Sequence, residues 1–208
     1  MSREPLVSQL RQELVSALEP LHSDCAAAAH VDALRCELQN STLTQEREGS
    51  VTEGPVLPWQ QLFPRADDWP APGLPALVNQ LIPLCRWFRG NEFYTRPEDR
   101  HFAERLWGAE LVGHDGGIFS CGQRFILLLI ILEPDTLYPL HAHRIEETYL
   151  VLAGRGEWTH DGHDWAQLEA GDSFHNESWQ AHAIRTGAEP VMTLGIYLPP
   201  FGWEGGLL

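Results

Sequence analysis

The sequence predicts a mainly β protein, a small β-barrel or sandwich that follows a helical N-terminal region. Two observations carry this prediction: apolar residues recur at helical spacing up to residue 107, and short β-type runs separated by glycine and aspartate follow. With 208 residues, of which 43% are hydrophobic, the chain can bury a core of its own. We therefore expect a helical region over residues 1–107 and a single barrel domain over residues 108–208.

The N-terminal region is expected to form four helices. In the first, Leu6, Leu10, Leu14 and Leu18 repeat every four residues and make an apolar stripe. Residues 39–75 are rich in proline, glycine, glutamate and threonine with little period, which favours a long irregular connection. The expected helices cover residues 6–18, 26–38, 74–87 and 97–107, the last with Pro97 at a favourable first-turn position.

Turn residues divide the C-terminal half of the chain into short strands. Turns are expected at Asp115-Gly116-Gly117, Gly154, Asp161-Gly162 and Gly171-Asp172. Many short strands in so short a segment are typical of a small barrel or sandwich. The expected strands cover residues 110–113, 124–133, 148–152, 156–160, 164–168, 182–186 and 191–198.

Composition excludes several classes of function. The formal net charge of −15 would repel a phosphate backbone over most of the surface, so nucleic acid is not an expected partner. All 14 basic residues are arginine, which excludes chemistry that needs a lysine amine. The cysteines form no CxxC pair, no apolar run reaches the roughly 20 residues of a membrane span, and no hydrophobic export segment follows Met1. We expect a cytoplasmic protein without membrane partners.

The stretch HAHRIEETY, residues 141–149, concentrates polar side chains after a strongly apolar run. Alternate side chains of a strand share a face, so His141 and His143 should point the same way, about 6.6 Å apart along the chain. Glu147 and Tyr149 form a second such pair, whereas Glu146 has the opposite parity and should face away. A helix would place the two histidines about 200° apart, so a strand is the better prediction for a convergent site.

Two imidazoles and a carboxylate suit a divalent first-row metal, and a fourth protein ligand would fix the ion. His182 is the natural candidate, because it ends the segment GDSFHNESWQAH, whose length would return the chain to the same end of a barrel. A lone histidine near a strand is usually structural, but here four candidates satisfy two spacing rules. The predicted ligands of one zinc, iron, manganese, cobalt or nickel ion are His141, His143, Glu147 and His182.

These segments resemble the two motifs of the cupin family. HAHRIEETYLVLAG matches the first motif, HxHxxxExxxxxxG, and GDSFHNESWQAH matches the second in its opening Gly-Asp and closing histidine. The chain departs from the motifs where Asp135 stands in place of a glycine, and where Glu177 and Trp179 stand in place of proline and glycine. The resemblance implies a single cupin β-barrel, of the double-stranded β-helix or jelly-roll type, behind an α-helical extension.

A longer pattern is similar to the cupin-type dimethylsulfoniopropionate lyases: Tyr138-x-x-His141-x-His143-x-x-x-Glu147-x-Tyr149, followed by His182-Ala-Ile-Arg-Thr186. This resemblance implies a metal-dependent carbon-sulfur lyase that splits dimethylsulfoniopropionate by β-elimination into dimethyl sulfide and acrylate. By matching position, Tyr149 is expected to be the general base and Tyr138 a substrate contact. The substrate is a zwitterion whose sulfonium suits aromatic faces, so Trp158 and Tyr197 are further candidate contacts.

Two other functions stay open at this point. One is a cupin dioxygenase that uses the same three histidines and one glutamate to hold iron. The other is a non-catalytic cupin that binds a small molecule. The leucine stripe of residues 6–18 has two uses as well: it can pack against the barrel of its own chain, which we favour, or form the surface of a homodimer.

Overall fold

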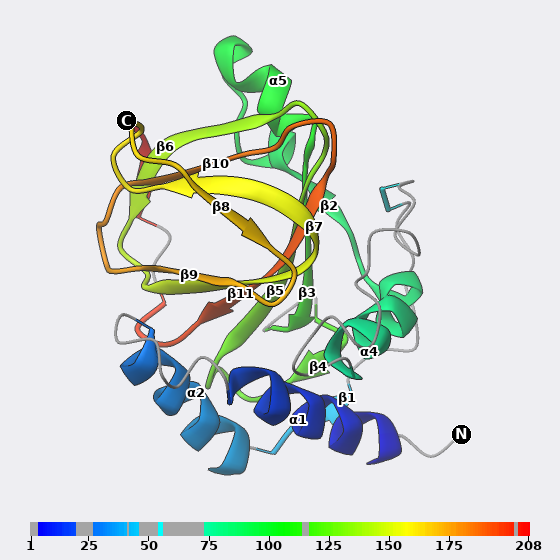
Figure 1. Cartoon of the computed structure of the whole chain (residues 1–208). Helices are drawn as coiled ribbons and strands as arrows, with labels where there is room; N and C mark the ends of the chain where they lie inside the picture. Colours follow the sequence, from blue (N-terminus) through cyan, green and yellow to red (C-terminus); the bar gives the residue numbers. More distant parts are fainter. Residues whose placement is uncertain are drawn as a thin grey trace.

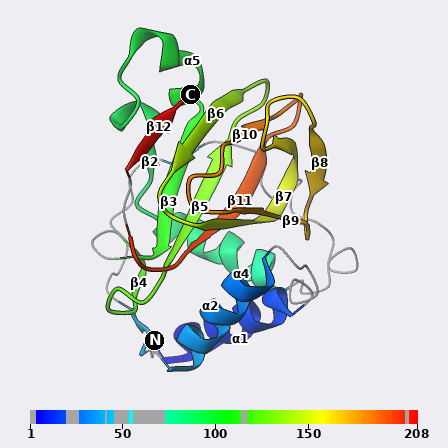
Figure 2. The same cartoon turned by 90° about the vertical axis from the view of Figure 1, so that its left-hand side faces the viewer.

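The computed structural model describes residues 4–19, 27–40, 42–45, 54–55, 73–113, 117–201 and 204–208. Over these ranges the chain is mainly β, and its sheet curls on itself above a group of helices (Figures 1 and 2). The predicted fold class is confirmed. None of the helices in these ranges is both long and apolar enough to cross a membrane.

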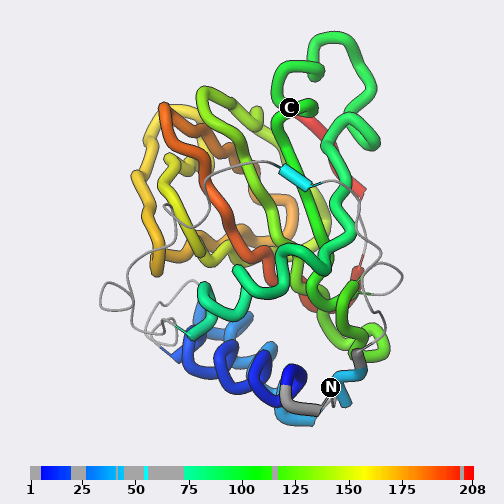
Figure 3. Tube along the Cα trace, turned by 90° about the vertical axis from the view of Figure 1, so that its right-hand side faces the viewer, coloured from blue at the N-terminus to red at the C-terminus, as the bar shows by residue number. Residues whose placement is uncertain are grey.

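Three helices of the N-terminal region pack together at one end of the barrel, and a fourth, short helix lies at the opposite end (Figures 1 and 3). The first two occupy the segments that the apolar spacing indicated. The α-helices are α1 (Glu4–Leu18), α2 (Ala28–Asn40), α4 (Gly73–Leu81) and α5 (Arg100–Ala103), and the 3₁₀ helices are η3 (Ile82–Leu84), η4 (Gly90–Glu92) and η5 (Pro97–Asp99).

The last two helices are shorter than predicted. α4 gives way to η3 at Pro83, which has no N–H to continue the α-helical ladder. The segment 97–107 forms η5 and α5 but turns into a strand at Leu106, so the prediction of a helix to residue 107 was wrong. Leu106 and Trp107 pair with Leu132 and Ile131, and tertiary pairing outweighs their helical spacing.

The strands form one curled, largely antiparallel sheet in the order β1-β4-β3-β5-β11-β7-β10-β6-β12, with β2 beside β3 and with β8 and β9 beside β7. β3 and β4 are the parallel pair. The strands are β1 (Thr44–Gln45), β2 (Phe88–Arg89), β3 (Leu106–Val112), β4 (Phe119–Ser120), β5 (Ile126–Leu132), β6 (Leu137–His143), β7 (Glu147–Thr159), β8 (Ala166–Glu169), β9 (Ser173–Asn176), β10 (His182–Arg185), β11 (Val191–Tyr197) and β12 (Gly205–Leu207).

β7 is one continuous strand where two were predicted. Gly154, expected to end a strand, lies inside β7 with a φ of 71°, next to a register shift against β11. A Cβ at this position would lie 1.9 Å from the carbonyl oxygen of Pro190, so only glycine fits. The bend lets the first part of β7 pair with β9 and β11, and the last part with β8 and β10. This curvature closes the barrel around the residues at the start of β7.

The two faces of the sheet belong to different clusters of buried side chains. Leu150 faces the helices, in a core that also contains Leu10, Leu14 and Leu18 of the leucine stripe. Tyr149 faces the barrel interior, in a cluster of aromatic and branched residues. The leucine stripe is therefore buried within its own chain, as favoured above. A homodimer stays a prediction, and it would have to form through another surface.

The helices and the sheet share one hydrophobic core. The division into a helical region ending at residue 107 and a barrel domain starting at residue 108 stays a prediction.

Two residues that stand in place of motif glycines adopt a backbone conformation that favours glycine. Asp135 has a φ of 52° and Trp179 has a φ of 64°, in the left-handed region where glycine is favoured. Aspartate tolerates this conformation better than most residues, whereas tryptophan does so at a cost of roughly 1–2 kcal/mol. The loops therefore have the geometry that the motifs imply, although the glycines are absent.

Candidate metal centre

The candidate site lies inside the barrel, at the start of β7 and beside β6 and β10. β10 lies between β7 and β6, and His182 is the direct cross-strand partner of His141. His143 and Glu147 lie on either side of the connection between β6 and β7. The structure brings His141, His143, His182 and Glu147 together, although they come from segments about 35 residues apart.

Three histidines offer nitrogen atoms to one point. One nitrogen of each of His141, His143 and His182 lies within 4.8 Å of the other two. The Oε2 atom of Glu147 lies 3.4 Å from His143 Nε2 and 3.3 Å from His182 Nε2. Glu147 and His182 are almost fully buried, whereas His143 is the most accessible of the four.

Backbone carbonyl groups fix the orientation of all three imidazole rings. The Nδ1 atoms of His141, His143 and His182 lie 2.8, 2.8 and 2.9 Å from the carbonyl oxygens of Pro139, Ile145 and Gln180. A carbonyl only accepts, so each Nδ1 carries a proton, and Nε2 is the nitrogen of each ring that can bind a metal. A second hydrogen bond of this kind is typical of histidines that bind a metal.

The charges of the site favour a cation between the histidines and Glu147. Without a cation, only a proton can offset the repulsion between the carboxylate oxygen and the Nε2 lone pairs of His143 and His182. Burial opposes ionisation of Glu147, but the two imidazoles hold the pKa of its carboxyl well below the usual range. Burial and the neighbouring His182 lower the pKa of His141 to about 3, so this ring is neutral near pH 7. Three imidazole nitrogens around a carboxylate form a ligand set that suits a divalent transition metal.

Glu147 is held from both sides by cross-strand partners. On β11, its partner Tyr197 donates a hydrogen bond to Oε1. On β9, its partner Asn176 donates from Nδ2 to Oε2 at 3.3 Å. His160 Nε2 in turn lies 3.1 Å from Asn176 Oδ1, and this ring is half-buried. Asn176 thus contacts Glu147 directly and His160 contacts Asn176, and sequence reasoning missed both.

All four tyrosines of the chain gather in and around the barrel interior. The ring of Tyr138 stacks on His141 at a centroid distance of 4.1 Å, and its hydroxyl contacts that of Tyr94. The ring of Tyr149 lies 6.4 Å from that of His182. Tyr138, Tyr149 and Tyr197 thus surround the histidines, whereas Tyr94 lies one layer further out.

Tyr149 is buried on the same face of β7 as Glu147, two residues further along. Burial raises the pKa of its phenol well above the ordinary value, and the negative charge of Glu147 adds to this effect. The phenol is therefore protonated at neutral pH unless positive charge is added nearby. A divalent cation beside Glu147 is the kind of charge that would lower this pKa.

Trp158 is fully buried in the interior cluster that also contains Tyr138 and Tyr149. The centroid of its ring lies 6.5 Å from that of Phe174. Its indole Nε1 makes no hydrogen bond to any described residue. A buried donor without a partner costs about 1–3 kcal/mol, which a bound acceptor would recover. Trp158 thus lies in the barrel interior, and its role as a substrate contact stays a prediction.

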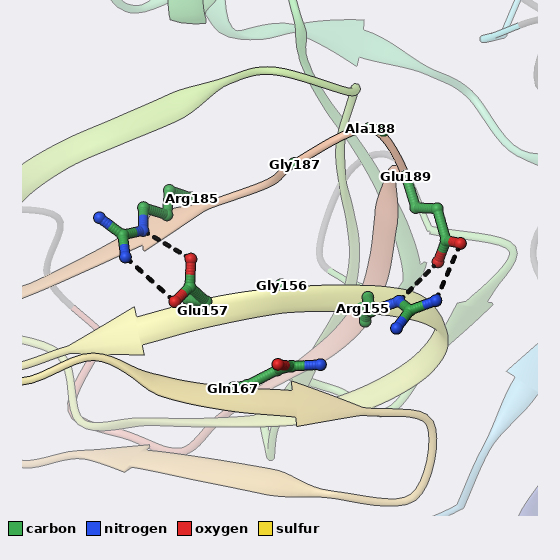
Figure 4. A pocket seen from close by; sticks show the side chains of 8 residues that line it. All are labelled: Arg155, Gly156, Glu157, Gln167, Arg185, Gly187, Ala188 and Glu189. Carbon is green, nitrogen blue, oxygen red and sulfur yellow. Dashed lines mark hydrogen bonds and ion pairs between the residues drawn. The ribbon is translucent and has the colours of Figure 1, made fainter.

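The hollow in Figure 4 is separate from this centre. It lies on the outside of the barrel, has a volume of about 350 Å³ and is lined by residues of β7, β8, β10 and the segment after β10. Its two arginines are each paired with a glutamate: Arg155 Nε lies 2.8 Å from Glu189 Oε2, and Arg185 Nε lies 2.7 Å from Glu157 Oε2. Because these charges satisfy each other, the hollow offers little to a charged ligand.

The C-terminal strand β12 pairs with the edge of β6. Replacing Gly205 by alanine should displace β12, because the new Cβ would lie 2.3 Å from Ala142 O and 2.6 Å from His143 Cα. We expect affinity for the metal to fall by roughly 10- to 100-fold, since the backbone that carries His143 must shift. Gly206→Ala is the matched control, because its Cβ would meet nothing within 4 Å. Competition with a chelator measures both; equal affinities would contradict the assignment.

The curled sheet and the inward-facing histidines define a cupin-type barrel, and comparison with solved structures agrees. The crystal structure of DMSP lyase DddQ from Ruegeria pomeroyi superposes with a TM-score of 0.65 over 95% of both chains, at 24% identity. A structure reported with the DMSP lyases RdDddP and RnDddQII gives a TM-score of 0.60 over 97% of this chain and 99% of that one, at 18% identity. The fold is thus a cupin β-barrel with N-terminal helices.

Sequence comparison then identifies the family. The family model for dimethylsulfoniopropionate lyases matches residues 41–193, most of the chain, so this protein belongs to that family. The lyase DddQ of Ruegeria pomeroyi is 33% identical over 106 residues, which are 51% of this chain and 49% of that protein. The putative lyase DddL of Cereibacter sphaeroides is 34% identical over 134 residues, which are 64% of this chain and 51% of that protein. The chain therefore spans about half the length of these curated relatives.

Proposed function

We propose that this protein is a metal-dependent lyase that cleaves dimethylsulfoniopropionate into dimethyl sulfide and acrylate, with Tyr149 as the general base. One observation carries the proposal: Glu147 Oε2 lies 3.4 and 3.3 Å from two imidazole nitrogens, and Tyr149 follows on the same face of β7. Family membership supports the substrate, because the matching relatives are named for it.

The residues that would hold the metal are His141, His143, His182 and Glu147. A bound divalent metal supplies a Lewis acid for the substrate carboxylate, a contribution of several kcal/mol to stabilising the charge that develops there, and favours the phenolate of Tyr149. Zinc, iron, manganese, cobalt and nickel all accept this ligand set, and availability decides between them.

Tyr149 carries the proton transfer in this proposal. The phenolate oxygen takes a proton from the carbon next to the substrate carboxylate. The electron pair of that C–H bond becomes the second bond of the new C=C double bond, and the C–S bond breaks toward sulfur. Sulfur leaves with the bonding pair, so the sulfonium becomes neutral dimethyl sulfide and the remaining fragment is acrylate. A proton that returns from Tyr149 to solvent completes the cycle.

The aromatic side chains of the interior would hold the sulfonium group. Tyr138 is the proposed substrate contact by its match to the family, and its ring is fixed between His141 and Phe102, at centroid distances of 4.1 and 5.4 Å. Tyr197 and Trp158 are further proposed contacts, although the hydroxyl of Tyr197 is already committed to Glu147. A cation over such rings gains about 2 kcal/mol when it is desolvated.

Protein loaded with one defined metal and incubated with dimethylsulfoniopropionate tests the proposal. We expect dimethyl sulfide in the headspace and an equal amount of acrylate in solution, without consumption of oxygen. Oxygen uptake without acrylate would favour the cupin dioxygenase. Tight binding of the substrate without turnover, for each metal named above, would favour a binding protein. A cytoplasmic location and a homodimer stay proposals.

A further inference from the structure

A second group of metal-binding side chains lies outside the barrel, between α2 and the outer side of β7 and β9. His30 belongs to α2, Glu146 precedes β7 and His175 belongs to β9. One ligand atom of each lies within 4.8 Å of those of the other two. Glu146 has the opposite strand parity to Glu147 and faces away from the barrel interior, as the sequence predicted. This group is therefore separate from the candidate centre inside the barrel.

A threonine hydroxyl links the two histidines and determines which nitrogens carry protons. Thr148 Oγ1 lies 2.8 Å from His30 Nδ1 and 2.9 Å from His175 Nδ1. A hydroxyl has one proton, so it donates to one ring and accepts from the other. His175 Nε2 lies 3.4 Å from Glu146 Oε1, a distance that a shared proton or a bound cation can bridge. When the hydroxyl accepts from His30 Nδ1, the proton of this ring is on Nδ1 and the lone pair is on Nε2.

His30 Nε2 is buried and makes no hydrogen bond within the part of the chain that the structure describes. The residue is only 4% exposed, and burial, with His175 nearby, lowers its pKa to about 4, so the ring is neutral. A buried lone pair without a partner is costly unless a ligand or a proton donor reaches it.

His30 lines an open hollow on the surface of the described part of the protein. It has a volume of about 340 Å³ and is lined by His30 and Glu146, together with Arg144 and residues of the segment after β11. The charge of Arg144 is partly balanced by Glu204, 3.6 Å away. The hollow therefore connects His30 and Glu146 with solvent, and the side chain of Glu146 is half-exposed.

We propose that His30, His175 and Glu146 form a second site for a divalent transition metal of the zinc class. In a tetrahedral site with bonds of about 2.1 Å the ligand atoms lie about 3.4 Å apart, so side-chain movement of an ångström or so closes the group. Two imidazoles and one carboxylate leave the fourth position to water, on the side of the hollow. The ion would join α2 to the barrel and make their packing dependent on metal.

Metal counting on the full chain tests this site. With zinc or cobalt added in excess and then dialysed, we expect about two ions per chain, and about one in Glu146→Gln and in His30→Gln. Glu177→Gln, which removes an exposed carboxylate outside the group, should keep two. His182→Ala should keep one ion, held by the outer site, whether or not the chain cleaves dimethylsulfoniopropionate.

A melting curve for each variant separates loss of the ion from loss of the fold, and Glu146→Gln is the safer variant because its side chain is half-exposed. Added zinc should raise the melting temperature of His182→Ala and leave that of the double variant His182→Ala with Glu146→Gln unchanged. A count of one ion in the natural chain, or two in both Glu146→Gln and His30→Gln, would overturn the proposal. Acrylate release from the same samples reports on the barrel centre separately.

Discussion

Replacing Tyr149 by phenylalanine should lower kcat for acrylate release by about 10²- to 10⁴-fold, the contribution of a positioned general base. The change removes one oxygen from a buried ring and leaves its volume nearly unchanged, so the fold should persist. The metal content should stay the same, because the three histidines and Glu147 are untouched. Acrylate release and metal content measured on the same preparation check both parts.

Tyr197→Phe is the matched control, since it removes the same atom from a neighbouring buried tyrosine. The hydroxyl of Tyr197 donates to Glu147, so its loss should weaken metal binding by roughly 10- to 100-fold. An excess of metal should restore most of the activity of Tyr197→Phe and none of that of Tyr149→Phe. If Tyr149→Phe kept near-normal kcat, Tyr149 would not be the base.

Replacing Glu147 by glutamine should abolish stable metal binding and, with it, acrylate release. The change keeps the size of the side chain but removes the negative charge of Glu147 that faces the imidazoles of His143 and His182. We expect the affinity for zinc or cobalt to fall by more than about 100-fold. This loss exceeds the roughly 10- to 100-fold expected when only a hydrogen-bond partner of a metal ligand is removed. Titration of the apo-protein with cobalt, followed by its absorption spectrum, measures the loss.

Glu177→Gln makes the same chemical change at an exposed position and should leave both metal affinity and acrylate release unchanged. A Glu147→Gln protein that bound the metal as tightly as the natural chain would remove Glu147 from the ligand set. Activity retained without bound metal would remove the metal from the mechanism.

Local patterns made much of the fold and the candidate site predictable. The leucine stripe gave α1, and the period of two along strands placed His141 beside His143 and Glu147 beside Tyr149 on shared faces. The inference that His182 returns to the same place depended on segment length and on the cupin resemblance. These features are encoded within short stretches, so the residues alone indicate them.

Other features depend on how distant strands pair, which the sequence does not show. Glu147 lies between Asn176 and Tyr197 because of the register of β7 against β9 and β11. Gly154 is a residue typical of turns, so the sequence predicts that a strand ends there. Pairing with β11 instead keeps β7 continuous, and the strand bends at this glycine. Predictions that fall on residues 46–53 and 56–72 lie outside the described residues.

His30, in the second group of metal-binding side chains, was the least predictable residue of the two sites. His30 lies on a helix expected from apolar spacing, more than a hundred residues before Glu146 and His175. Nothing in its local pattern distinguishes it from other residues of that helix. Only the packing of α2 against the barrel brings it to Thr148.

Anomalous diffraction at the absorption edge of cobalt, from crystals of the cobalt-loaded protein, tests the central claim most directly. We expect a strong peak inside the barrel, at about 2.0–2.2 Å from the Nε2 atoms of His141, His143 and His182 and from a carboxylate oxygen of Glu147. A fully loaded, active protein with no peak at these four side chains would contradict the account.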